Sequence, residues 1–185
     1  MKRQFIYVCT LLLGLLGSAN AFSQTEKGDW LVGGNFTLNT TRNTTISLTP
    51  NAGYFFARNF AMGGNVRLSY DKSGDLELTT LGIGPFVRYY FGKNNLRPFG
   101  LVEYNFTSIK AKNGESSTTS NGGEFFIGPG LAAFVNEHVA IETIAGYINS
   151  KYSGESANGG FSLRIGFQIY LSPRKIVDTY RSNGK

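Results

Sequence analysis

Six charged residues occupy alternate positions within otherwise apolar segments, and they are the strongest candidates for chemistry in this sequence of 185 residues. They are Arg67, Arg88, Arg164, Glu103, Glu124 and Glu142. If the residues around them alternate between the two faces of β-strands, all six point to one face, which we expect to be the interior of a barrel. Charges enclosed there must pair, because an unpaired buried ion is strongly destabilising. We expect a polar plug that stabilises the barrel; a path for protons or small solutes through a rearranging network is the alternative.

Residues suited to catalysis or metal binding are scarce. His138 is the only histidine, and it falls between two apolar segments, so we expect a surface turn residue rather than part of a triad or a metal site. The pairs Gly82-x-Gly84 and Gly128-x-Gly130 lack the third glycine and the following helix of a nucleotide site. We expect them at inward positions where bulky side chains would not fit. The sequence therefore predicts no enzyme activity, no metal and no cofactor.

The beginning of the chain has the pattern of a secretory signal peptide. Basic residues precede an apolar run over residues 5–17, and alanines follow at the two positions that a signal peptidase reads. We assign residues 1–21 to the signal peptide, since the run is shorter than the roughly 20 residues of a membrane-spanning helix. The single cysteine, Cys9, lies within it. The mature chain would then have no disulfide, thiolate or cysteine-ligated zinc.

Composition favours a β-rich protein. Charged residues make up 16% and aromatic residues 14% of the chain, and it has 24 glycines, whereas a typical soluble domain has about 25% charged residues. This argues against a helical bundle, a coiled coil or a disordered chain. Removing the two basic residues of the signal peptide lowers the net charge of +6 by two. Nucleic acid is not an expected partner, because the remaining basic residues do not cluster with aromatic ones.

Eight segments alternate apolar and polar residues with a period of two, which is typical of β-strands with unlike faces. They cover residues 30–39, 45–55, 60–70, 78–91, 97–106, 124–135, 139–148 and 161–171. The last segment is as long as the roughly 9–11 residues that cross a membrane as a tilted strand. The polar face carries small neutral residues and almost no lysine. We therefore expect the apolar face to contact lipid and the polar face to line the barrel.

Aromatic residues of the apolar face fall near the strand ends, as in the two interfacial girdles of a membrane barrel. The girdle candidates are Trp30, Tyr54, Phe60, Tyr89 and Phe91 at one rim, and Tyr70, Tyr104, Phe106, Phe125, Tyr147 and Phe161 at the other.

The connectors between these segments are expected to alternate between long loops and short turns, as in exported bacterial barrels. The longest, residues 107–123, contains Lys110, Lys112 and a run of serine and threonine. It is long enough to contact a host surface, a phage or a polysaccharide; tolerated surface variation is the alternative. Eight strands place both termini on the short-turn side, which would be the periplasm.

Four prolines fall inside the expected strands, where a closed barrel has no free edge for a missing N–H group. They are Pro50, Pro85, Pro98 and Pro129. We expect bulges or strand ends at these positions.

The sequence resembles the small eight-stranded outer-membrane barrels of the OmpA/OmpX type, a porin-like β-barrel domain. The residues that carry the resemblance are Trp30-Leu31-Val32-Gly33-Gly34, Asn59-Phe60-Ala61-Met62, His138-Val139-Ala140-Ile141, Phe86-Val87-Arg88-Tyr89-Tyr90-Phe91 and Gly166-Phe167-Gln168-Ile169-Tyr170-Leu171. The resemblance spans residues 28–171. It implies a fold and does not imply an activity.

We therefore predict an all-β protein, an eight-stranded antiparallel up-and-down transmembrane β-barrel over residues 22–171, followed by a short basic periplasmic tail over residues 172–185. We expect a monomer in the outer membrane of a Gram-negative bacterium, surrounded by lipid. Its expected role is non-enzymatic, in envelope structure or surface interaction, with at most a narrow or plugged channel. Two alternatives remain: a soluble periplasmic lipocalin-like barrel that binds an apolar ligand, suggested by Gly28-Asp29-Trp30, and a lipid-modifying enzyme.

Overall fold

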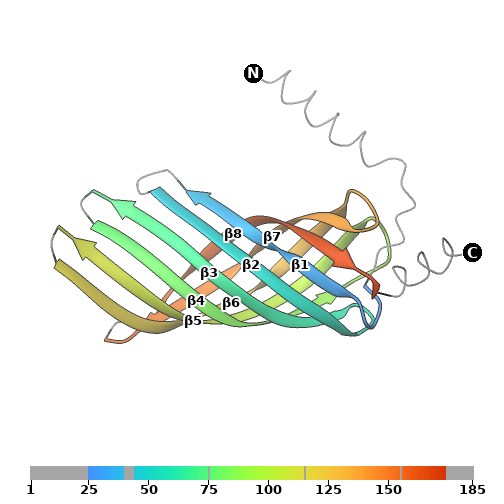
Figure 1. Cartoon of the computed structure of the whole chain (residues 1–185), viewed down its shortest axis with the longest axis horizontal. Coiled ribbons are helices and arrows are strands. Elements are labelled where there is room, and N and C mark those ends of the chain that lie inside the picture. Colours follow the sequence, from blue (N-terminus) through green and yellow to red (C-terminus); the bar gives the residue numbers. More distant parts are fainter. Residues whose placement is uncertain (1–24, 40–43, 75, 115, 155, 174–185) are drawn as a thin grey trace, which may run out of the picture.

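A computed structural model describes residues 25–39, 44–74, 76–114, 116–154 and 156–173. They form a closed barrel in which each strand is antiparallel to its neighbours in the sequence, and the first strand closes the barrel against the last (Figure 1). The strands are β1 (Trp30–Asn39), β2 (Thr44–Ala57), β3 (Phe60–Ser73), β4 (Leu76–Tyr90), β5 (Leu96–Asn113), β6 (Ser116–Phe134), β7 (Val139–Tyr152) and β8 (Asn158–Leu171). The predicted eight-stranded up-and-down barrel is confirmed. The predicted signal peptide, and the predicted tail from residue 174 onward, lie outside the described residues.

The two faces of the barrel differ in chemistry as the alternation predicts. In β8, the side chains of Phe161 and Ile165 are 78% and 57% exposed. Those of Arg164 and Gln168, on the other face of the same strand, are 3% and 0% exposed. The same alternation continues around the barrel, because side chains of successive strand residues point to opposite faces. The apolar stripe therefore faces outward and the charged residues face the lumen. No helix in the described ranges has the length and apolarity needed to cross a membrane.

The barrel has two distinct ends. β1 begins and β8 ends at the same end, where Trp30 pairs with Leu171, and we call this the terminus end. The opposite end, at which β1–β2, β3–β4, β5–β6 and β7–β8 are joined, is the hairpin-tip end (Figure 1). At the terminus end, the expected strand boundaries agree with the structure to within two residues.

The strands extend further toward the hairpin tips than the alternation predicts. The expected loop over residues 107–123 is wrong, since β5 and β6 continue through it and stay paired from Thr107 opposite Gly122 to Asn113 opposite Ser116. Polar side chains replace the apolar stripe there, but the ladder needs only backbone N–H and C=O groups, and threonine is favourable in strands. Gly114, at the turn, has a positive φ of 60°, which suits glycine.

The expected difference in loop length between the two ends is also wrong. The links at the hairpin-tip end cover residues 40–43, 74–75, 114–115 and 153–157, and those at the terminus end cover residues 58–59, 91–95 and 135–138. Both sets are short. The asymmetry between the ends comes from the length of the strands themselves, because β5 and β6 have 18 and 19 residues and β1 has 10.

The expected bulges or strand ends are wrong for Pro50, Pro85 and Pro129, which lie within continuous strands, whereas Pro98 does lie near the beginning of β5. Pro50, Pro85 and Pro129 each pair with one neighbouring strand, opposite Gly34, Gly64 and Gly100. On the other side of each proline the ladder has a gap, and the register is the same before and after it. Pro98 lies beyond the last pair of the β4–β5 ladder, Tyr90 with Phe99. Each proline therefore lacks a backbone pair with the neighbouring strand on one side, and its ring faces outward.

Candidate functional site

The lumen of the barrel holds the chemistry of this protein. The structure places all six charged candidates inside and brings them together as three ion pairs, each linking a strand to the third strand further along the sequence. The pairs are Arg67 with Glu124, Arg164 with Glu103 at 2.9 Å, and Arg88 with Glu142 at 2.7 Å. They follow one another from the hairpin-tip end to the terminus end. An ion pair therefore spans the lumen at each of three levels along the barrel.

The pair nearest the terminus end is the most enclosed. The Arg88 Nη1 donates to Glu142 Oε2, while the hydroxyls of Tyr170 and Tyr90 lie 3.1 and 3.4 Å from Glu142 Oε1. The Tyr170 hydroxyl also donates to the Tyr90 hydroxyl at 3.0 Å. The guanidinium of Arg88 lies 5.3 Å from the centre of the Phe99 ring, which adds a cation–π contact. This level satisfies the buried carboxylate with several donors, as a buried charge requires.

The middle pair lies in a more polar layer. Arg164 Nη1 and Asn105 Nδ2 both donate to Glu103 Oε1 at 2.9 Å, and the Arg164 guanidinium stacks 3.9 Å from the centre of the Phe126 ring. Some buried polar atoms in the lumen, on Asn65 and Gln168 among others, have no hydrogen-bond partner in the protein. Buried polar groups are almost always hydrogen bonded, so this layer is suited to holding ordered water.

The third pair forms the floor of a vestibule that opens at the hairpin-tip end. Arg67 donates to Glu124, whose second oxygen accepts a hydrogen bond from the Ser150 hydroxyl at 3.3 Å. The vestibule has a volume of about 450 Å³, and its upper wall includes Asp71 and Tyr152. It is lined by both polar and apolar groups. A small polar molecule could enter from this end as far as the Arg67–Glu124 pair.

An aromatic cluster, not predicted from the sequence, fills the lumen at the terminus end. Its members are Phe55, Tyr90, Phe99, Phe134 and Tyr170. Their rings lie 4.9–6.2 Å from one another in five contacts. The sequence did carry a signal, because the last inward positions of β4, β6 and β8 at this end are aromatic, and so are Phe55 near the end of β2 and Phe99, which follows Arg97 on the inner face of β5. We call this group the aromatic plug.

The chain before β1 packs against the terminus end of the barrel, where Thr25 and Asp29 are buried. Arg97, which the sequence analysis also missed, donates to the Thr25 hydroxyl at 2.6 Å, and that hydroxyl donates to Asn59 at 2.7 Å. The hydroxyl of Ser172, just after β8, donates to Asp29 at 2.7 Å. These contacts join the segment before β1 to the β2–β3 turn, to β5 and to the residue just after β8.

The remaining sequence candidates are the aromatic girdle residues, His138 and the two glycine pairs. The eleven aromatic girdle candidates have outward side chains; nine are exposed, and Tyr54 and Phe60 are half-buried. His138 is exposed in the turn between β6 and β7, where its ring nitrogen lies 3.2 Å from the Tyr170 carbonyl oxygen. Gly84 and Gly128 point inward, and Gly130 lies directly beneath the Phe99 ring. No group of three or more potential metal ligands occurs among the residues that the structure describes.

The geometry places ion pairs and aromatic rings across the lumen. It is also the reverse of a lipocalin, which needs apolar side chains around a central cavity, because here the apolar stripe of β8 points away from the axis. The lipocalin alternative is therefore not favoured.

Comparisons with known proteins agree with this architecture. The chain superposes on Neisserial surface protein A with a TM-score of 0.56 and 16% identity, covering 77% of this chain and 93% of that one. It superposes on the N-terminal β-barrel domain of OprF from Pseudomonas aeruginosa with a TM-score of 0.50 and 16% identity, covering 78% of this chain and 98% of that one. At such identities the likeness concerns the fold alone. No protein of curated function matches the chain.

Membership of a family rests on the sequence itself. The model of one family, described as the outer membrane protein beta-barrel domain, matches residues 9–168. This range includes all eight strands except the last three residues of β8. The lipid-facing exterior and the charged interior described above are what a barrel needs in an outer membrane. The chain belongs to the outer membrane protein beta-barrel domain family.

Proposed function

We propose that this protein is a non-enzymatic, closed barrel that stabilises the cell envelope and does not form an open channel. The observation that carries the proposal is the terminus-end level of the lumen. There Arg88, Glu142, Tyr90 and Tyr170 are each at most 1% exposed and hydrogen bonded to one another. An eight-stranded barrel is only wide enough for its interior side chains to fill it, so such a layer leaves little room for a hydrated ion.

Single-channel recording tests this proposal directly. The refolded protein should add no steps above the background of a planar lipid bilayer. The matched control is a variant with Arg88→Ser and Glu142→Ser, together with Tyr90→Ser, which shortens the side chains of this level. Insertion of both proteins into the bilayer should be checked by flotation with vesicles. Reproducible conductance steps of the unaltered protein would contradict a closed lumen and favour a solute path through the ion pairs.

We further propose that the hairpin tips face the cell exterior and that both ends of the mature chain lie in the periplasm. In this orientation the basic tail after β8 would be periplasmic. The orientation is supported by the length of β5 and β6, whose outer parts carry exposed serine, threonine and lysine. A single cysteine introduced at Ser117 should react with a membrane-impermeant maleimide on intact cells, and one at Asn136 should not. The opposite labelling pattern would reverse the orientation.

Surface interaction is a second candidate role, supported by the β5–β6 hairpin. Its paired outer segments present an exposed polar strip from Lys110 to Thr119. Replacing residues 110–119 with a two-residue turn should leave the barrel folded. If the hairpin contacts a host surface, a phage or a polysaccharide, the shortened protein should lose binding in whole-cell assays. Equal binding by the shortened and full-length proteins would exclude this hairpin as the contact.

A further inference from the structure

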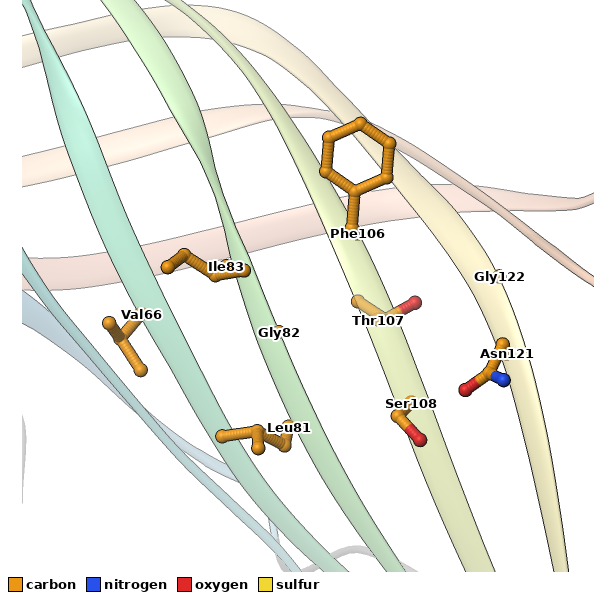
Figure 2. A pocket seen from close by; sticks show the side chains of 9 residues that line it. All are labelled: Val66, Leu81, Gly82, Ile83, Phe106, Thr107, Ser108, Asn121 and Gly122. Atoms are coloured by element: carbon orange, nitrogen blue, oxygen red, sulfur yellow. The ribbon is translucent and has the colours of Figure 1, made fainter.

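A concave site lies on the lipid-facing surface of the barrel, outside the lumen. A groove of about 500 Å³ opens on the outer face of β3, β4, β5 and β6 (Figure 2). Outward apolar side chains form its walls, namely Val66, Leu81, Ile83 and Phe106. The floor is formed at Gly82, Thr107 and Gly122 (Figure 2), which occupy inward positions of β4, β5 and β6 and so present backbone rather than side chains to the groove. The groove therefore lies between large outward side chains, over backbone whose own side-chain positions face the lumen.

The groove is apolar along its walls and polar toward the hairpin tips. Ser108 and Asn121 are directly opposite each other on β5 and β6, one outward position beyond Phe106 and Gly123. Both line the groove (Figure 2). A serine and an asparagine on a lipid-facing surface are costly beside hydrocarbon unless they meet a polar group. They therefore mark the level at which the ester and headgroup region of the membrane begins.

Two lysines flank this polar end. Lys110 is the next outward residue of β5 after Ser108, about 7 Å further along the strand. Lys151 of β7 lies opposite Gly123, the neighbour of Gly122 in the floor. Both lysines are exposed. Glu77, an outward acidic residue of β4, is hydrogen bonded to Lys72 at 3.1 Å. The two lysines give this edge of the groove a positive character.

We propose that this groove binds an acyl chain of an anionic, phosphate-bearing membrane lipid whose phosphate contacts Lys110 and Lys151. The occupant must combine an apolar chain with a negative headgroup, and it must reach a site on the outer wall of the barrel. A membrane lipid meets these conditions without leaving its leaflet. Lysine can extend its charged end to the headgroup level while its stem covers apolar surface. This inference goes beyond the closed lumen and does not depend on it.

β8 offers an internal comparison. Its outward residues, Phe161, Ile165 and Phe167 among them, are as apolar as the walls of the groove, and β8 contains no lysine. Lipid should contact this strand without preference for headgroup charge. A preference found beside the groove and absent from β8 would therefore distinguish a site from general contact with the bilayer.

Tryptophan quenching by brominated lipid can measure this preference. The full chain without its signal peptide would carry Trp30→Phe, so that the only tryptophan is the one introduced at Phe106, or at Phe167 for the comparison. Each protein is refolded into phosphatidylcholine vesicles that contain either brominated phosphatidylglycerol or brominated phosphatidylcholine with the same chains. We expect the anionic lipid to be preferred at position 106 by about fivefold or more, from two lysines near the membrane surface. At position 167 the ratio should be about one.

Two sets of variants separate the headgroup from the chain. Lys110→Gln with Lys151→Gln should bring the ratio at position 106 to about one, whereas Lys93→Gln, at the terminus end, should not change it. Ser108→Leu with Asn121→Leu should fill the groove and also abolish the preference, although both lysines remain. Each variant must show the faster migration of the unheated barrel on gels, and a variant that fails is replaced by its Ser108→Val and Asn121→Val counterpart.

Three results would overturn the proposal. The first is an equal ratio at positions 106 and 167 in the protein with all its lysines. The second is a preference that survives filling of the groove, which would mean attraction of anionic lipid without a chain site. The third is absence of quenching at position 106 by either lipid together with a dimer in detergent, which would show that a second copy covers the groove.

Discussion

Replacing Glu142 with leucine would leave the guanidinium of Arg88 buried at 1% exposure without its carboxylate. Removing one partner of a buried ion pair costs about 3–5 kcal/mol. The hydroxyls of Tyr90 and Tyr170 would also lose Glu142 as a neighbour, but they would keep their mutual hydrogen bond of 3.0 Å, so this loss adds only about 1 kcal/mol. We expect Glu142→Leu to lower the free energy of unfolding by about 4–6 kcal/mol.

The double variant Arg88→Met with Glu142→Leu provides the control. Replacing a whole buried pair with apolar residues of similar volume is often neutral, so most of the stability should return. The interaction energy from the double-mutant cycle should then be about 3 kcal/mol or more. For Arg67 and Glu124, where the arginine side chain is 17% exposed at the vestibule floor, solvent screening should reduce the same quantity to about 1 kcal/mol.

Urea unfolding of the barrel in lipid vesicles, followed by the fluorescence of Trp30 and by the gel migration of unheated samples, measures these energies. Additive effects of the two substitutions, with an interaction energy below about 0.5 kcal/mol, would refute the reasoning. Arg88 and Glu142 would then be solvated independently rather than paired in a closed lumen.

Three further predictions follow from the packing and the charges. An added Cβ at Gly130 would lie 2.3 Å from the Phe99 ring, whereas one at Gly100 meets nothing within 4 Å. In urea unfolding, Gly130→Ala should therefore lower the free energy of unfolding by about 1–3 kcal/mol, and Gly100→Ala should leave it nearly unchanged. Pro85→Val restores a backbone donor at the gap between β4 and β5, and should raise the free energy of unfolding by about 1 kcal/mol; a loss of stability would mean that the gap is required by packing. The pKa of Glu77 lies below its ordinary value, mainly because Lys72 donates a hydrogen bond to it and secondly because Lys72 is positively charged. Lys72→Met should therefore raise that pKa in an NMR titration. An unchanged pKa would contradict the ion pair.

The alternation of side chains predicts the strands well wherever one face contacts lipid. At the terminus end, β3 and β7 begin at Phe60 and Val139, as the sequence indicates. At the other end the apolar stripe stops before the ladder does. Beyond Phe106 the outward residues are Ser108 and Lys110, which resemble a loop although their backbone stays paired. Side-chain pattern therefore shows the part of each strand in the membrane and not its full length.

The sequence predicts which charged residues lie in the lumen, but it does not predict which of them form ion pairs. Alternation places Arg88 and Glu142 on the inner face, but which charges meet depends on the relative height of strands far apart in the sequence. That height is set by the stagger of the closed barrel, which a single sequence does not display. The aromatic plug was missed for a different reason. Phe55 and Phe99 lie on the polar face, and an interior described as small and polar leaves no place for them.

The central claim is that the apolar face of each strand contacts lipid while its charged face packs in a closed lumen. Nitroxide labels at single cysteines along residues 161–171 of β8, in vesicles, test it most directly through their accessibility to oxygen and to a water-soluble nickel complex. We predict high oxygen accessibility at odd positions such as Ile165, and low accessibility to both agents at even positions such as Arg164 and Gln168. Higher accessibility to the nickel complex at the odd positions, or oxygen accessibility in the opposite phase, would contradict the account.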